Sequence, residues 1–231
     1  MTISGSNRTA GRNRITSSLY GHPGLDTLTE RALRLAARPG RALLGIVGEP
    51  GAGKSTFAEQ LWTRLEEQHP GLAVTVSMDG FHLAQKVIGA RGETALKGTI
   101  GTFDADGFLA LLVRTRAETA NTVWWPEFDR TLEDAVAGAI EVAEHHRLVI
   151  VDGNFLLATR EPWRRVKDVL DESWFLDARP DARRERLTRR YISYGFTPQA
   201  ARAKALGVDE DTSALIRSTA CRADLVISED G

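Results

Sequence analysis

The stretch G-E-P-G-A-G-K-S at residues 48–55 constrains this chain more than any other part of it. It matches the pattern G-x-x-x-x-G-K-[S/T] at every fixed position. Glycines let successive backbone N–H groups turn toward an anion, and the helix that follows adds its positive N-terminal end. The pattern therefore predicts a phosphate-binding loop, formed by Gly48, Glu49, Pro50, Gly51, Ala52, Gly53, Lys54, Ser55 and Thr56.

The segments on either side of this loop have the patterns of a strand and a helix. Residues 43–47 form a short apolar run, which is typical of a buried parallel strand. Residues 56–65 place apolar side chains on one face of a helix. Strand, loop and helix follow in the order that a phosphate loop needs. In that order Lys54 is expected to reach the β- and γ-phosphates, and the Ser55 hydroxyl is expected to bind Mg²⁺.

Composition narrows the class of protein. The chain has 231 residues and a net charge of −1, so its length suits one domain and its charge gives no field that attracts nucleic acid or an anionic membrane. No apolar run approaches the ~20 residues of a membrane span. Cys221 is the only cysteine, which excludes an internal disulfide and favours a cytoplasmic location. Its side chain is expected to be buried.

Residues 1–23 differ from the rest of the chain. They contain three arginines and many small polar residues, with no acidic residue before Asp26. We interpret them as a disordered N-terminal arm, and residues 24–231 as a single domain. A capping box at Thr27–Glu30 predicts that the first helix begins there and runs to about Ala37.

Further along the chain, apolar runs alternate with helical patterns. Strands are expected at residues 72–78, 121–126, 147–152, 174–177 and 225–227. This alternation predicts an α/β fold with a doubly wound parallel sheet of about five strands. Residues 83–106 lack periodicity and contain four glycines, which favours a functional loop. Asp104 or Asp106 is expected to begin the helix after it.

Charged side chains follow several of the predicted strands. In a parallel sheet every strand ends at the same edge, and ligands bind there. Lys54, Asp79, Arg130 and Asp152 each lie just past the end of a predicted strand. Asp152 is expected to bind Mg²⁺ together with Ser55, directly or through a water. Asp79 is expected to accept the proton of an alcohol during phosphoryl transfer. A simple Asp-Gly turn is the alternative for both acidic residues.

Arginines are dense after residue 177. Arg183, Arg186 and Arg190 are spaced to lie on one face of a helix, where they can clamp a phosphoryl group and withdraw when a lid opens. We therefore predict a helical arginine lid at about residues 179–205, with a solvated basic face as the alternative. The aromatic residues considered for an acceptor pocket are Trp124, Trp125, Phe128, Tyr191 and Tyr194.

Together these motifs resemble the uridine kinase, pantothenate kinase and phosphoribulokinase group of P-loop kinases, and look most like its bacterial branch of nucleoside or sugar kinases. The likeness runs from about Leu43 to Ile227. It rests on the segments 48–55, 78–82, 102–104, 128–130, 152–157 and 186–190. The resemblance implies ATP and Mg²⁺, a small hydroxyl-bearing metabolite as acceptor, and Asp79 as the base. A homodimer is left open.

On this basis we assign catalytic roles to Lys54, Asp79, Arg130, Arg186 and Arg190. Arg183 is placed with the nucleotide-binding residues, and Ser55 and Asp152 with the metal.

One segment and two single residues depart from the family's pattern. Residues 96–101 read L-K-G-T-I-G where R-K-G-A-P-E is usual, Asp152 stands where Glu is common, and Thr212 stands where Asn is usual near the adenine. The acceptor therefore stays open among a nucleoside, a pantothenate-like alcohol and a sugar. A nucleotide-binding regulator or ATPase of the same fold, without phosphotransfer, is the alternative function. A GTPase is disfavoured because no Asn-Lys-x-Asp motif is present.

Overall fold

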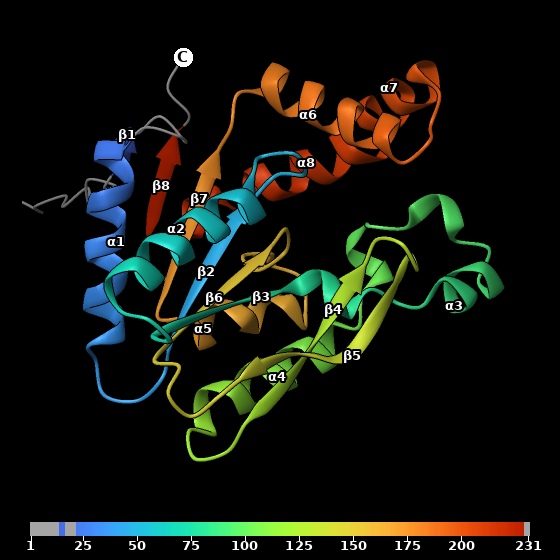
Figure 1. Cartoon of the computed structure of the whole chain (residues 1–231). Helices are drawn as coiled ribbons and strands as arrows, with labels where there is room; N and C mark the ends of the chain where they lie inside the picture. The colour runs from blue at the N-terminus through green and yellow to red at the C-terminus, as the bar shows by residue number, and fades with distance from the viewer. Residues whose placement is uncertain (1–13, 17–21, 229–231) are drawn as a thin grey trace, which may run out of the picture.

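A parallel sheet forms the centre of the computed structural model, which describes residues 14–16 and 22–228 (Figure 1). In these residues the sheet has six strands in the order β1-β8-β7-β2-β6-β3. The strands are β1 (Arg14–Thr16), β2 (Ala42–Gly48), β3 (Ala73–Ser77), β6 (Leu148–Gly153), β7 (Glu172–Asp177) and β8 (Leu225–Ser228). All neighbouring pairs run parallel, which confirms the predicted fold. The strand that leads into the phosphate loop, β2, lies between β7 and β6.

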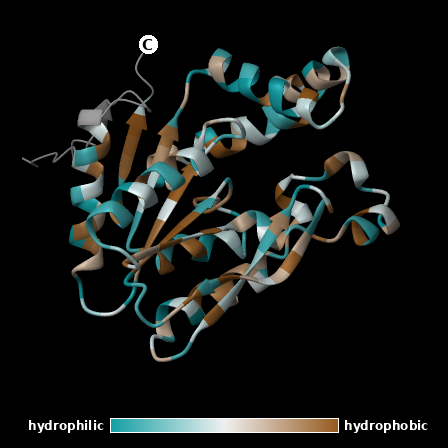
Figure 2. Cartoon of the chain, in the orientation of Figure 1, coloured by the Kyte–Doolittle hydropathy of each residue, from teal (hydrophilic) through white to brown (hydrophobic). Residues whose placement is uncertain are grey.

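Two hydrophobic cores lie on the two faces of this sheet, and Figure 2 shows apolar residues concentrated on the strands. Every residue of β2 is buried: Leu44 and Ile46 belong to one core, Leu43 and Val47 to the other. A strand covered on both faces has a continuous run of apolar residues, which explains why β2 can be recognised in the sequence. The first face is covered by α1 (His22–Ala36) and α2 (Lys54–Gln68), the second by α4 (Ala105–Ala117), α5 (Val166–Val169) and α8 (Val208–Ser218).

Residues 121–126, predicted as a strand of the parallel sheet, belong instead to a separate antiparallel hairpin. In this hairpin β4 (Val123–Asp129) pairs with β5 (Asp134–Val142). The sequence did not indicate β5, because most of its residues are small or exposed and form no apolar run. The register shifts between Trp125 and Glu127, on either side of the only proline in β4. The Trp125 ring is fully buried, 5.7 Å from Phe81 and 5.9 Å from Phe108. These contacts fix the hairpin beside the second face of the sheet.

The N-terminal boundaries differ from the prediction. Residues 14–16, predicted as part of a disordered arm, form β1 beside β8, and α1 begins at His22 rather than at the capping box. Residues 1–13 and 17–21 lie outside the described residues. Cys221 is exposed rather than buried, because it lies in a short 3-10 turn between α8 and β8.

The stretch 83–106 contains the short helix α3 (Gln85–Ala90) and two 3-10 turns. The Asp104 carboxylate accepts the Gly107 N–H at 2.9 Å and so begins α4, which settles the choice between Asp104 and Asp106.

The predicted lid is a pair of helices, α6 (Pro180–Ser193) and α7 (Pro198–Leu206), which project beyond the sheet in Figure 1. They share a small apolar cluster of their own, formed by Leu187, Tyr191, Ala201 and Ala205. Within the described residues, every helix is too short or too polar to cross a membrane.

Candidate active site

The phosphate loop leaves β2 at Gly48 and ends where α2 begins. Gly51 and Gly53 have φ angles of +80° and +87°, a region in which side chains other than glycine are strained. Gly53 is also the N-cap of α2, and no side chain caps the helix there. The first N–H groups of α2 therefore face the loop without a side-chain acceptor, which is the arrangement that binds phosphate oxygens.

Lys54 is the first residue of α2, and its ammonium group contacts the backbone of the phosphate loop. Its Nζ donates a hydrogen bond to the Glu49 carbonyl oxygen at 3.0 Å. Burial lowers the pKa of Lys54 to about 8, although the charges of Asp152 and Asp79 act in the opposite direction. The charges of Asp152 and Asp79 thus stabilise the ammonium form of the loop lysine against the effect of burial.

Ser55 and Asp152 form the second contact of the site. The Ser55 hydroxyl donates to Asp152 Oδ2 at 2.7 Å and so joins the start of α2 to the end of β6. Asp152 is almost completely buried, and burial followed by the charge of Asp79 raises its pKa. An acidic side chain held here in a poorly solvated place gains most from a nearby cation.

Asp79 follows β3 in a 3-10 turn, η1 (Met78–Phe81), and its Oδ2 accepts a hydrogen bond from Arg130 at 2.7 Å. Arg130 comes from the end of β4, with its guanidinium 4.7 Å from the Phe128 ring centre. The hairpin approaches η1 so closely that a Cβ on Gly80 would lie 2.3 Å from the Pro126 carbonyl oxygen. Arg130 thus reaches the predicted place from the hairpin and not from the parallel sheet.

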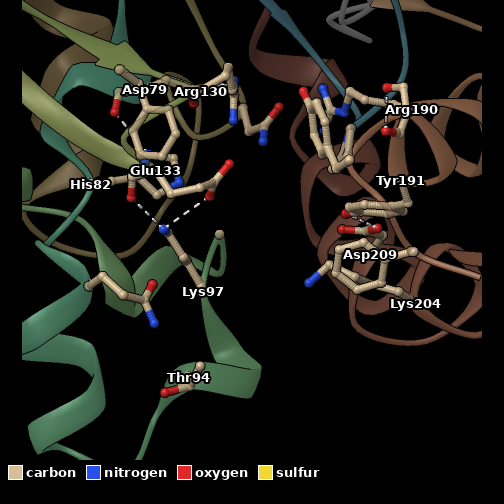
Figure 3. A pocket seen from close by; sticks show the side chains of 18 of the residues that line it. Asp79, His82, Thr94, Lys97, Arg130, Glu133, Arg190, Tyr191, Lys204 and Asp209 are labelled. Atoms are coloured by element: carbon tan, nitrogen blue, oxygen red, sulfur yellow. Dashed lines mark hydrogen bonds and ion pairs between the residues drawn. The ribbon is translucent and has the colours of Figure 1, made fainter. Parts of the chain in front are cut away.

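A cleft of about 670 Å³ opens beside these residues (Figure 3). One wall carries Asp79, His82, Lys97, Phe128, Arg130 and Glu133, and the other carries Arg190, Tyr191, Tyr194, Phe196, Lys204 and Asp209. Of the five aromatic residues considered from the sequence, the structure brings only Phe128, Tyr191 and Tyr194 to the cleft. Trp125 is buried beneath the hairpin and Trp124 is exposed.

Sequence reasoning missed Lys97 and Glu133. The Lys97 ammonium lies 5.2 Å from the Phe128 ring centre and donates to the Glu133 carbonyl oxygen at 2.8 Å. It also forms an ion pair with the Glu133 carboxylate at 3.3 Å. Lys97 lies in the glycine-bearing stretch that the sequence does mark as functional. Glu133, in the hairpin turn with φ +53°, carries no comparable signal.

The three predicted lid arginines have different surroundings. Arg190 lines the cleft and lowers the pKa of Lys54 by its charge, although less than burial does. Arg186 donates to the Gly51 carbonyl oxygen at 3.4 Å. Arg183 is completely buried against Glu49 and Glu210 and does not line the cleft. One of its nitrogens lies 3.4 Å from the Pro50 carbonyl oxygen of the phosphate loop, and its role with the nucleotide stays a prediction. Thr56 lies exposed in the first turn of α2.

Comparison with known proteins places these features in a family. No family model matches the chain. Over 176 residues it is 31% identical to a Schizosaccharomyces pombe protein named "Putative uridine kinase C227.14", and the match covers 74% of this chain and 75% of that one. The chain belongs to the P-loop kinases of the uridine kinase group.

Two further comparisons agree. This P-loop kinase is 36% identical to a solved structure from Silicibacter sp. TM1040, a "putative fructose transport system kinase", with a TM-score of 0.80 over 87% of this chain and 98% of that one. It is 31% identical over 144 residues to a pantothenate kinase of Mycolicibacterium vanbaalenii, a match that covers 62% of this chain and 45% of that protein. The P-loop kinase is therefore a phosphotransferase.

Proposed function

We propose that this P-loop kinase transfers the γ-phosphoryl group of ATP to a hydroxyl group of a small metabolite, in the presence of Mg²⁺. The observation that carries the proposal is the convergence of three contacts beside one cleft: Lys54 on the phosphate loop, Ser55 with Asp152, and Asp79 with Arg130. A nucleotide-binding regulator would need only the first two contacts, those of Lys54 and of Ser55 with Asp152. The Asp79–Arg130 pair adds an acidic group where an acceptor can reach it.

In this proposal the phosphate loop and its lysine hold the donor. The backbone N–H groups from Gly51 to Ser55 surround the phosphate chain, and Lys54 neutralises the β- and γ-phosphates. Arg186 and Arg190 extend from α6 toward the same region and add positive charge as the phosphoryl group leaves ADP. None of these residues carries out covalent chemistry, because their role is to position the phosphates and stabilise charge.

The Ser55–Asp152 pair fits Mg²⁺. A hydroxyl oxygen and a carboxylate oxygen 2.7 Å apart, at the foot of the phosphate loop, are oxygen donors of the kind that this ion uses alongside phosphates and water. When bound, Mg²⁺ would supply positive charge that offsets the charge of the phosphates. Ser55 and Asp152 would hold it there, with Asp152 acting directly or through a water.

Asp79 is the proposed base. Its carboxylate accepts the proton of the acceptor hydroxyl as that oxygen bonds to the γ-phosphorus, and the bond from phosphorus to the ADP oxygen breaks. Arg130 donates to the same carboxylate and so fixes its direction. The phosphorylated product and ADP leave the cleft, and the proton on Asp79 then passes to water.

The acceptor is proposed to occupy the cleft between the hairpin wall and α6. Phe128, Tyr191 and Tyr194 supply flat apolar surface. Lys97 supplies a positively charged hydrogen-bond donor, and Glu133 supplies a negatively charged acceptor. Such a lining suits a compact polyhydroxyl compound with a ring or short chain. Nucleosides, sugars and pantothenate-like alcohols all meet this description, and the relatives' names include a uridine kinase and a pantothenate kinase.

A panel of acceptors tests this function. Purified protein is incubated with ATP and Mg²⁺, with and without nucleosides, sugars and pantothenate-like alcohols, and ADP release is measured beside the mass of the products. We expect ADP release to depend on one class of acceptor, whose mass rises by one phosphoryl group. ATP binding without phosphorylation of any acceptor would favour the regulatory alternative, and acceptor-independent ADP release would indicate an ATPase.

The helical lid is also a proposal, and hydrogen exchange tests it. We expect ATP with Mg²⁺ to slow amide exchange in residues 190–206, because closure over the phosphates orders the outer part of α6 and α7. Amides of β8, which carries none of the proposed ligand-binding residues, serve as the control and should not change. Equal exchange in residues 190–206 with and without nucleotide would instead support a solvated basic helix.

A further inference from the structure

Glu49 does not line the cleft, although this residue is the second of the phosphate loop. It is 3% exposed, and its two carboxylate oxygens accept hydrogen bonds from Arg217 at 2.9 and 2.8 Å. The Nε of Arg183 lies 3.1 Å from the same carboxylate. Glu49 thus joins the loop to α6 through Arg183 and to α8 through Arg217.

Arg183 continues this cluster. No part of its side chain is exposed, and its guanidinium pairs with Glu210 of α8 as well as with Glu49. One of its nitrogens also lies 3.4 Å from the Pro50 carbonyl oxygen. Glu210 in turn accepts from Arg184 and lies 3.7 Å from Arg217. Two carboxylates and three guanidinium groups therefore form one connected cluster beneath the loop.

The backbone of the loop is in contact with the same helix. A Cβ on Gly51 would lie 2.7 Å from the Arg183 carbonyl oxygen and 2.8 Å from Leu187 Cγ. α6 therefore packs directly against the backbone of the loop and leaves no room for a side chain between them. Figure 1 shows α6 and α8 on the side of the sheet where β2 enters the loop.

We propose that Glu49 is a positioning residue: with Arg183 and Arg217 it holds the phosphate loop in the shape that binds ATP, and it makes that shape depend on α8. This inference rests on the proposed function, since it concerns the binding of ATP. Glu49 touches neither the cleft nor the proposed metal site. It acts through the loop backbone, whose N–H groups and Lys54 hold the phosphates.

The physical reason is that a buried charge must keep its partners. Removing one partner leaves the others in a poorly solvated place, and the structure relaxes to bring them to water. The loop is the part free to relax, since its glycines allow many backbone conformations. A relaxed loop presents its N–H groups in several directions, and ATP binding must then restore one of them.

Arg217 provides the first test, because it is 47% exposed, lies on α8 and can be replaced with less risk to folding than Glu49. Arg217→Gln should weaken ATP binding about tenfold, the usual effect of losing a hydrogen bond to a charged group. Arg217→Lys keeps the charge but cannot bond to both oxygens, and should fall between Arg217→Gln and the unchanged protein. The Kd of ATP is measured by calorimetry well below the unfolding temperature of each variant.

Three further variants complete the experiment: Glu185→Gln, Glu49→Gln, and Glu49→Gln combined with Arg217→Gln. Glu185→Gln removes an exposed ion pair between Glu185 and Arg189, both on α6. It serves as the control, and no change in the Kd of ATP is expected. Glu49→Gln combined with Arg217→Gln should weaken ATP binding by much less than the product of the two single effects, because both remove the same interaction.

The outcomes are distinct. A lower unfolding temperature with an unchanged Kd of ATP in Arg217→Gln would overturn the proposal. The cluster would then stabilise the fold without affecting ATP binding. Independent effects of the two substitutions would overturn it as well. If the unchanged protein fails to bind ATP, the proposed function is wrong, and the positioning role of Glu49 falls with it for that separate reason.

Discussion

Replacing Lys54 by alanine is expected to abolish detectable phosphoryl transfer, with turnover falling by about 10³-fold or more, and to weaken ATP binding greatly. The substitution removes the one ammonium group on the phosphate loop, which accompanies the γ-phosphoryl group into the transition state. Turnover is measured by ADP release with the true acceptor, and ATP binding by calorimetry. Lys86→Ala, at an exposed position in α3, is the matched control and should retain normal turnover.

The same lysine gives the reaction a characteristic pH dependence. Burial lowers the pKa of Lys54 to about 8 in the free protein, so the ammonium group loses its proton as the pH rises through 8. Because ATP requires the charged form, its affinity should fall above pH 8, and binding there should take up a proton. Lys54→Ala should lack this dependence. Near-normal turnover in Lys54→Ala would mean that the loop is not the catalytic phosphate site.

Replacing Asp79 by asparagine should separate catalysis from nucleotide binding. We expect turnover to fall by about 10²–10⁴-fold, the usual contribution of a positioned base, with the Kd of ATP nearly unchanged. The amide has nearly the same shape, and its oxygen still accepts from Arg130, so the cleft should keep its form. Turnover and the Kd of ATP with Mg²⁺ are measured in parallel.

Asp106→Asn, at an exposed position of α4, is the control for Asp79→Asn and should leave both quantities unchanged. If Asp79 acted only on the metal, Mg²⁺-dependent ATP binding would fall together with turnover. Transfer at the normal rate in Asp79→Asn would refute the assignment of the base, and Asp152 or Asp129 would then be the candidates.

The parts of the molecule that the sequence predicts are those whose signals are local. The phosphate loop, β2 and β6 follow from short apolar runs and glycine spacing, and these patterns are set by neighbours along the chain. Ser55 and Asp152 meet because parallel strands end at one edge, a rule that needs no side-chain detail. Their hydrogen bond is therefore the kind of contact that sequence reasoning can anticipate.

The rest depends on contacts between distant segments. The apolar pattern of β4 is the same in a hairpin as in a parallel sheet, so periodicity alone assigns it to the wrong sheet. Arg183 has the same helical spacing as Arg190, yet it is buried because two acidic residues from other segments surround it. Helical spacing identifies which residues share a face, but it does not reveal what that face meets.

The small apolar cluster shared by α6 and α7 separates the energetics of the lid from those of the sheet. Leu187, Tyr191, Ala201 and Ala205 form a cluster distinct from both sheet cores, so opening of the proposed lid would expose neither sheet core to water. The free energy of that opening would depend on this cluster and on the ion pairs that Arg183 and Arg184 of α6 form with Glu49 and Glu210. We therefore expect substitutions in this cluster to change the residence time of the product in the cleft, while the sheet keeps its stability.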